Sequence, residues 1–268
     1  MTRVGVFGAA GRMGATVCAA VLGAPDLDLV AAVDPAAAGR PLDEVAALHD
    51  SGIEIAASPD AMGEAGAEVA VDFTVAVAAR GNLLWCADHG VHVVCGTTGL
   101  DDADLDAMRV WFSGDAHAVL AANFSIGAAL MMRCAELCAP WVSGAEVIEL
   151  HHDRKRDAPS GTSLETARRM QASRVASGAG DWSADPTEVE LVAGARGGRA
   201  EGGLHVHSVR LPGLVAHQEV LFGLQGETLS LRHDSLDRVS YMPGVLLAVR
   251  RVAGLRGLTV GLSSLLGI

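Results

Sequence analysis

Residues 1–14 of the chain read MTRVGVFGAAGRMG and contain the first indication of the fold. An apolar run over residues 3–7 ends at Gly8, and an Ala- and Val-rich stretch with helical character follows over residues 11–23. Gly8, Gly11 and Gly14 therefore have the spacing G-x-x-G-x-x-G between a predicted strand and a predicted helix. Glycines in this position permit a tight turn, close approach of the backbone to a pyrophosphate, and close packing of helix on strand. The stretch predicts dinucleotide phosphates at the N-terminus of the first helix.

An aspartate strengthens this prediction. Asp34 lies 20 residues after Gly14, at the end of a second predicted strand over residues 27–33, where a carboxylate can accept hydrogen bonds from ribose hydroxyls. The first glycine interval is one residue longer than in G-x-G-x-x-G, so an ordinary turn and a surface aspartate remain the alternative. The residues expected to contact the dinucleotide in this region are Gly8, Ala9, Ala10, Gly11, Arg12, Met13 and Asp34.

The alternation of short strands and helices continues through the first half. Residues 68–73, 91–95 and 117–121 read as strands, with helical patterns between them, which is typical of βαβ units in a Rossmann-like, doubly wound parallel α/β sheet. A turn follows each of the strands 91–95 and 117–121, and ligands bind at the carboxyl ends of such strands. The alternative is that these are ordinary turns, in which Gly and Asn are common. The turn residues expected at the cofactor are Gly96, Thr97, Thr98, Ala122, Asn123, Phe124 and Ser125.

The pattern changes after about Asn123. We expect a helix over residues 126–139, a strand over 145–150 and a helix from Thr162, followed by a long loop within 172–203. Three strand-like runs at 204–211, 215–222 and 227–233 are closely spaced, which predicts antiparallel pairing in a second, α+β unit. A final apolar stretch over 239–252 reads as a helix that returns to the first unit.

Composition excludes several classes of protein. The 268 residues are 50% hydrophobic, which is too apolar for a disordered chain, yet no run approaches the roughly 18 apolar residues of a membrane span. The net charge of −12 argues against nucleic-acid binding. The chain enters a strand at once, so we expect no signal peptide, and the five cysteines are odd in number without a C-x-x-C pair, which favours reduced thiols in the cytoplasm.

We expect no metal site. Cys134 and Cys138 are four residues apart on an apolar helix, but no second pair of ligands accompanies them. His205 and His207 share one face of a predicted strand, where a polar sheet face is the simpler interpretation of the pair.

Residues 149–165, ELHHDRKRDAPSGTSLE, concentrate positive charge in an acidic chain. A histidine, or a lysine tuned by its surroundings, can donate a proton near neutral pH. Thr162 and Glu165 have capping-box spacing, so we expect a helix to begin at Thr162 and its preceding turn to offer N–H groups and hydroxyls to a carboxylate. A solvated basic loop before a helix is the alternative. The cationic residues are His151, His152, Arg154, Lys155 and Arg156.

Within this segment, Glu149 to Thr162 has the form E-x-H-H-x-x-K-x-D-x-P-S-G-T and resembles the signature of the 4-hydroxy-tetrahydrodipicolinate reductase (dihydrodipicolinate reductase) family. Further stretches resemble that family in order along essentially the whole chain. They are GAAGRMG at 8–14, VDFT at 71–74, GTTG at 96–99, AANFS at 121–125 and HSVRLPGLVAHQEVLF at 207–222.

The resemblance implies a dinucleotide-binding domain over 1–122 and 236–268, and a substrate-binding and oligomerisation domain over 123–235. It implies reduction of a cyclic dicarboxylate by NADH or NADPH with loss of water, in lysine and diaminopimelate biosynthesis, by a cytoplasmic homotetramer. His151 would serve as acid/base and Lys155 as proton donor. The residues expected at the substrate's carboxylates are His152, Ser160, Gly161 and Thr162.

Two other functions are compatible with the glycine turn and Asp34. One is a different two-domain NAD(P)-dependent dehydrogenase acting on an amino acid or sugar, and the other is a non-catalytic nucleotide-sensing module. Neither needs the His-His-Lys segment, which therefore separates them from the reductase.

Overall fold

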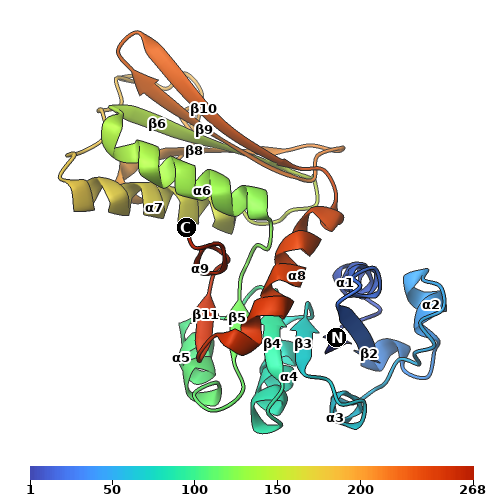
Figure 1. The fold of residues 1–268 in the computed structure, drawn as a ribbon. Coiled ribbons are helices and arrows are strands. Elements are labelled where there is room, and N and C mark those ends of the chain that lie inside the picture. The colour runs from blue at the N-terminus through green and yellow to red at the C-terminus, as the bar shows by residue number, and fades with distance from the viewer. The chain divides into compact units, whose positions relative to one another are not determined.

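A computed structural model describes residues 1–268, and the chain divides into two compact units (Figure 1). Unit 1 comprises Met1–Ile126 and Tyr241–Ile268, and unit 2 comprises Gly127–Ser240. Each unit has its own sheet. None of the helices combines the length and the apolar character that crossing a bilayer requires.

Unit 1 is built on a six-stranded, wholly parallel sheet in the order β11-β5-β4-β3-β1-β2 (Figure 1). This confirms the predicted Rossmann-like sheet. Phe7, Asp72, Cys95 and Leu120 lie in register across four neighbouring strands, so the segments that follow these strands begin at one edge. The strands are β1 (Thr2–Phe7), β2 (Leu27–Val33), β3 (Val69–Asp72), β4 (His92–Cys95), β5 (Ala118–Leu120) and β11 (Leu258–Val260).

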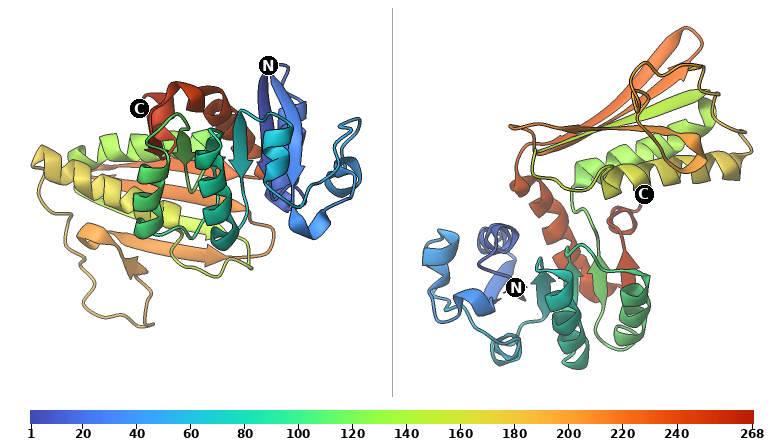
Figure 2. Two further views of the ribbon diagram at one scale, coloured as in Figure 1. Left: turned by 90° about the horizontal axis from the view of Figure 1, so that it is seen from below. Right: turned by 180° about the vertical axis from the view of Figure 1, so that it is seen from behind.

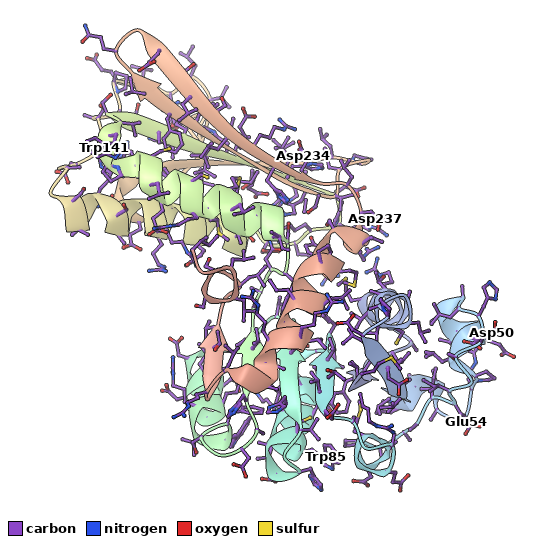
Figure 3. All side chains as sticks on the ribbon, viewed as in Figure 1. Asp50, Glu54, Trp85, Trp141, Asp234 and Asp237 are labelled. Carbon is purple, nitrogen blue, oxygen red and sulfur yellow. The ribbon has the colours of Figure 1, made fainter.

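Helices cover this sheet. Its central strand β3 is buried at every position, as is typical of parallel strands that are covered on both faces. Trp85, labelled in Figure 3, lies on α4. Its indole N–H donates to Asp60 on α3 (3.1 Å), which links the two helices. The helix predicted over residues 239–252 begins at Met242 rather than Val239, because residues 238–241 form a 3₁₀ turn and Pro243 stands in the first turn of this helix, α8. The helices are α1 (Arg12–Leu22), α2 (Leu42–Ala46), α3 (Asp60–Glu64), α4 (Ala76–Asp88), α5 (Asp102–Trp111), α8 (Met242–Arg251) and α9 (Ser263–Leu266).

Unit 2 contains a five-stranded mixed sheet in the order β10-β9-β6-β8-β7. The predicted antiparallel pairing holds for β9 and β10 but is wrong for β8, which pairs in parallel with β6 and does not neighbour β9. The connection over residues 211–215 is long enough to pass the two strand spacings that separate β8 from β9. The strands are β6 (Gly144–His151), β7 (Gly198–Arg199), β8 (His205–Arg210), β9 (Ala216–Leu224) and β10 (Glu227–Ser235).

Two helices, α6 (Ile126–Cys138) and α7 (Gly161–Ser177), cover one face of this sheet, as all views in Figures 1 and 2 show. Their small residues Ala135 and Ala167 pack with Val147, Val220 and Phe222 from the strands. The core of unit 2 therefore lies between these helices and that face, and it holds the end of β6 and the start of α7 in fixed positions.

Candidate active site

The glycine turn at the carboxyl edge of unit 1 has the geometry that its spacing predicts. Gly8 has φ +69°, and a Cβ on Gly14 would lie 2.0 Å from the carbonyl oxygen of Gly8. Helix α1 starts directly after Gly11, whose position as N-cap provides no side-chain hydrogen bond. A close-packed turn that leads into an uncapped helix N-terminus fits the phosphates of a dinucleotide.

Asp34 is connected to this turn. Its Oδ2 accepts a hydrogen bond from the N–H of Ala10, and its Oδ1 accepts one from the N–H of Ala36, both at 3.1 Å. The structure thus brings Asp34 and the glycine turn together. Arg12 and Arg40, the two nearby cations in sequence, are both exposed.

The other two predicted cofactor segments follow β4 and β5, but several of their side chains are engaged internally. The hydroxyl of Thr97 donates to Asp72 (2.7 Å), and Oδ1 of Asn123 accepts from the N–H of Ser125 (2.8 Å). Phe124 is buried and its ring lies edge-on to Phe73, with centroids 5.7 Å apart. Any contact of Thr97 with a cofactor would therefore use atoms other than its hydroxyl hydrogen.

The cationic segment begins at the end of β6 in unit 2. Glu149 and His151 point to the same side of that strand, because they are two residues apart, and Nδ1 of His151 is hydrogen-bonded to Oε2 of Glu149. Arg210, opposite His151 on β8, donates two hydrogen bonds to Glu149, at 2.9 and 2.7 Å. Glu149 is fully buried, so its charge is balanced by these two neighbours.

These contacts set the protonation of His151. Burial lowers the pKa of His151 below its usual value, and this effect outweighs the opposing influence of the Glu149 carboxylate; Lys155 and Arg210 lower it further. Burial acts to raise the pKa of Glu149, but hydrogen bonds from Arg210, Ser208 and His151 outweigh it, so this pKa is lowered. With Nδ1 donating to a carboxylate, Nε2 is the ring nitrogen through which His151 can exchange a proton.

Lys155 is held beside the same group. Its Nζ donates to both carboxylate oxygens of Asp157, at 2.8 and 2.7 Å, and this interaction lowers the pKa of Asp157. Arg210 donates to the backbone oxygen of Asp157 at 2.7 Å, so one guanidinium supports both Glu149 and the Lys155 partner. His152 lies in the intervening turn, where its Nδ1 accepts from the N–H of Arg154 (3.2 Å).

Helix α7 begins earlier than predicted. Ser160 is its N-cap and accepts from the N–H of Ser163, so the predicted capping box of Thr162 and Glu165 is wrong. Residue 163 is a serine and cannot complete a box with Ser160, whereas Glu165 pairs with Arg168 and Arg169. A Cβ on Gly161 would meet no atom within 4 Å, so the first turn is open at this position.

The cap is anchored on the sheet by Gln218 of β9. Its Oε1 accepts from the hydroxyl of Ser163 (2.9 Å), and its Nε2 donates to Oγ1 of Thr166 (2.8 Å). Ser160 and Ser163 are joined through their hydroxyls at 2.8 Å, and all of these side chains are buried. The open N-terminus of α7 is therefore rigidly placed.

Sequence reasoning missed the supporting side chains. Glu149 and Asp157 lie inside the cationic segment, and Asp72 ends an apolar strand, so their positions gave a usable signal. Arg210 and Gln218 come from strands 50 to 70 residues later along the chain, and no local pattern connects them to this segment.

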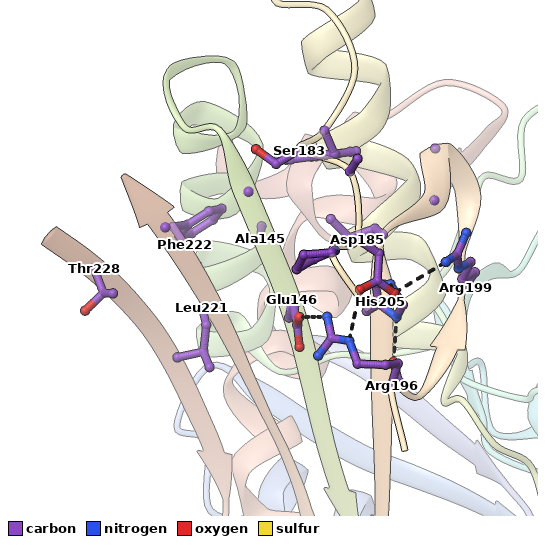
Figure 4. A pocket seen from close by; sticks show the side chains of 18 residues that line it. Ala145, Glu146, Ser183, Asp185, Arg196, Arg199, His205, Leu221, Phe222 and Thr228 are labelled. Carbon is purple, nitrogen blue, oxygen red and sulfur yellow. Dashed lines mark hydrogen bonds and ion pairs between the residues drawn. The ribbon is translucent and has the colours of Figure 1, made fainter. Parts of the chain in front are cut away.

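A separate cavity of about 470 Å³ in unit 2 contains none of the predicted site residues (Figure 4). Asp185 lies within reach of His205 Nε2 (3.2 Å), and Glu146 binds both Arg196 and His207 (2.7 Å to the latter). The pKa of Asp185 is lowered to about 2, chiefly by the hydrogen bond from Thr187. His205 and His207 are thus paired with carboxylates, and no group of three metal-ligating side chains is present.

Comparison with known proteins agrees with this arrangement. The family described as dihydrodipicolinate reductase, N-terminus, matches residues 2–124, and the family described as dihydrodipicolinate reductase, C-terminus, matches residues 127–266. The chain is similar to 4-hydroxy-tetrahydrodipicolinate reductase of Nocardia farcinica, with 49% identity over 268 residues and 99% of each chain covered. It is 48% identical over 270 residues to the protein of that name from Cutibacterium acnes, with both chains fully covered.

A solved structure gives the same result. Dipicolinate-bound dihydrodipicolinate reductase from Paenisporosarcina sp. TG-14 superimposes with a TM-score of 0.84 at 35% sequence identity, covering 98% of this chain and 99% of the other.

Proposed function

The chain belongs to the dihydrodipicolinate reductase family, and from this premise we propose how its residues reduce 4-hydroxy-tetrahydrodipicolinate to tetrahydrodipicolinate. The reaction uses NADH or NADPH, releases water, and belongs to lysine and diaminopimelate biosynthesis. The observation that carries the assignment of roles is the buried Glu149–Arg210 pair, which orients His151 beside Lys155 at the end of β6.

His151 and Lys155 supply the proton. When bound, the reduced nicotinamide supplies the hydride. The reduced ring must then gain a proton, for which Nε2 of His151 and the ammonium of Lys155 are the paired candidates. The pKa of His151 is lowered by burial in the free protein, so the ring is mainly neutral at pH 7. A dianionic substrate beside it favours the protonated form, which couples substrate binding to readiness of the acid.

The substrate's carboxylates bind at the start of α7. The first N–H groups of a helix have no partner within the helix and favour anions. Ser160 contributes mainly as the cap that fixes this turn, since its hydroxyl is engaged with Ser163. Gly161, Thr162 and His152 are the groups we assign to the carboxylates, and Lys155 exchanges Asp157 for substrate.

The dinucleotide binds at the carboxyl edge of unit 1, over Gly8–Met13 and Asp34, with the segments Gly96–Thr98 and Ala122–Ser125 beside it. Asp34 can accept from ribose hydroxyls but repels a 2′-phosphate, and the following residues 35–38 bring no cation. Use of NADH at least as well as NADPH follows from this charge.

The active form is a homotetramer, assembled through the sheet of unit 2. On β9, Val220 and Phe222 belong to the core shared with the helices, whereas Leu221 between them points to the other face; Leu221 and Phe222 both line the cavity of Figure 4. A sheet with apolar side chains on both faces commonly buries the second face against a symmetry mate. Light scattering is expected to give four times the chain mass, and a monomer at every concentration would contradict the proposal.

The reductase assignment is tested by NADH oxidation with freshly prepared cyclic substrate, against a panel of 2-oxo acids and sugars. Turnover confined to the cyclic dicarboxylate is expected. Turnover of a panel member alone would favour a different two-domain dehydrogenase, and NADH binding without any turnover would favour a sensing module.

A further inference from the structure

Asp72 is a fully buried carboxylate at the last position of β3, and its four hydrogen-bond donors are all uncharged. Its Oδ1 accepts from the N–H of Thr74 (2.9 Å) and from the hydroxyls of Thr74 and Thr97, both at 2.7 Å. Its Oδ2 accepts from the amide of Asn82 at 2.8 Å. Burying a carboxylate is costly unless it is fully hydrogen-bonded, so this arrangement needs all four donors.

The donors come from three different segments. Thr74 is in the turn after β3, Asn82 is on α4, and Thr97 is in the segment after β4, which has no regular secondary structure. Thr97 is nevertheless only 4% exposed. The backbone oxygen of Asp72 also accepts from the N–H of Gly96 (2.8 Å), so the residue holds that segment by both its backbone and its side chain.

The next residue completes the arrangement. A Cβ on Gly96 would lie 2.0 Å from the ring of Phe73, so the ring packs directly on the backbone of the same segment. The Phe73 ring also meets Phe124, in the segment after β5. Residues 72 and 73 thus join the three segments that follow β3, β4 and β5.

We propose that Asp72 is a positioning residue for the dinucleotide: it acts through Thr97 and the turn at Thr74 to shape the edge on which the cofactor binds, without touching it. This inference rests on the proposed cofactor site. The same region is apolar, since burial, and then the nearby Asp72 carboxylate, raise the pKa of the Cys95 thiol to about 12.

The test exchanges the two partners on β3 and α4. In Asp72→Asn, an amide with its oxygen toward Thr74 and Thr97 turns its NH₂ to the NH₂ of Asn82, and the flipped amide turns its NH₂ to the N–H of Thr74. In either orientation one donor stays unsatisfied. In the double variant with Asn82→Asp, the donor and acceptor are exchanged and the hydrogen bond is restored. Leu83→Ala is the control, since it removes a buried side chain from the same helix and weakens only the core.

The main readout is the NADH dissociation constant from fluorescence titration, beside Tm. Asp72→Asn is expected to weaken NADH binding about tenfold or more, the double variant to return to within about threefold of wild type, and Leu83→Ala to lower Tm alone. An unchanged dissociation constant in Asp72→Asn, or a double variant as weak as the single one, would overturn the proposal.

Two further outcomes are decided by the same measurements. If Asp72→Asn does not fold, Asn82→Leu removes one donor only, on a residue outside the proposed cofactor site, and it must weaken NADH binding for the proposal to stand. Because NADH binding is measured without substrate, a wild-type protein that binds NADH but reduces no cyclic dicarboxylate would refute the proposed function and leave this test of Asp72 intact.

Discussion

The two candidate binding regions of this protein differ in the groups that they present: mainly backbone in unit 1 and charged side chains in unit 2. The edge of unit 1 presents backbone: the glycine turn has no room for a Cβ at Gly14, and Thr97 and Asn123 use their side chains internally. The segment after β6 in unit 2 presents charged side chains: His151 is held by the buried Glu149, and Lys155 by the exposed Asp157. Substitutions should therefore affect geometry and cofactor affinity in the first region, and proton transfer in the second.

The largest expected effect is on proton transfer. His151→Ala or Lys155→Ala is expected to lower kcat on the order of 10²-fold or more, the usual scale of general acid–base catalysis, while the NADH dissociation constant changes little. Steady-state kinetics and fluorescence titration check the two halves. A folded double variant that binds NADH and retains near-normal kcat would refute the mechanism.

The neighbouring carboxylate-binding residues provide a contrast within the same segment. His152→Ala and Thr162→Ala are expected to raise KM for the cyclic substrate with a smaller change in kcat, because they weaken binding rather than proton transfer. Equal losses of kcat in all four variants would mean that the segment acts only as a structural element.

The second effect concerns the support of His151. Glu149→Gln is expected to lower kcat by at least about tenfold and to displace the pH profile, because an amide no longer fixes the ring or favours its protonated form. The same change leaves the partly buried Arg210 without its carboxylate, so Glu149→Gln with Arg210→Met is the stability control. Recovery of Tm without recovery of kcat is the expected result for the double variant, and an unaltered pH profile would argue against positioning.

The third effect concerns the glycine turn of unit 1, where a substitution should change backbone geometry and NADH affinity. Gly14→Ala is expected to lower Tm by several degrees and to weaken NADH binding, since its Cβ would lie 2.0 Å from the Gly8 oxygen and the turn must move, at about 1–3 kcal/mol. Gly11→Ala is the milder change in the same turn, with a smaller expected loss of Tm, because its Cβ would approach the same oxygen only to 3.1 Å. A Gly14→Ala variant with lowered Tm and the NADH affinity of wild type would show that the turn does not bind the cofactor.

Features of the fold that depend on local spacing could be predicted from the sequence, and those that depend on long-range pairing could not. The parallel sheet, the boundaries of β2 and the glycine turn depend on local spacing, and the structure has β2 over residues 27–33 as predicted. Pairing of β8 with β6 was not predictable from spacing, because the closest strands along the chain need not be neighbours in a mixed sheet. Strand β11, with three residues, is too short to give a periodic signal.

The site shows the same division. The cationic residues were visible in one continuous segment, whereas Arg210 and Gln218, which fix that segment and the cap of α7, come from β8 and β9. The start of α7 was predicted one residue late, because Thr162 and Glu165 imitate a capping box while Ser160 makes the actual cap. The sequence therefore predicted the functional groups that lie in one segment, but not the side chains from distant strands that hold them.

A smaller effect concerns cofactor choice. Asp34, held by the N–H groups of Ala10 and Ala36, keeps its negative charge beside the glycine turn. NADH is therefore expected to be used at least as well as NADPH, and kcat/KM measured with both cofactors checks this. A preference for NADPH above about tenfold, roughly 1.4 kcal/mol, would contradict it and would direct attention to Arg12 or Arg40 as a phosphate partner.

The smallest expected effect is on the pH dependence of the free energy of unfolding, to which one histidine in each unit contributes. Burial lowers the pKa of His151 in unit 2 and of His92 in unit 1, so the unfolded chain binds protons at a higher pH than the folded one. Stability is therefore complete above the usual histidine pKa of about 6.5 and falls as pH drops below it, by at most about 1.4 kcal/mol per pH unit for each histidine. In the wild type, Nδ1 of His92 accepts a hydrogen bond from the N–H of His117 (3.0 Å). An asparagine in place of His92 keeps an acceptor for this N–H but cannot be protonated near neutral pH. Urea unfolding at pH 7.5 and 5.5 should show a smaller loss for His92→Asn than for wild type, and equal losses would mean that the folded protein protonates His92 as readily as the unfolded chain does.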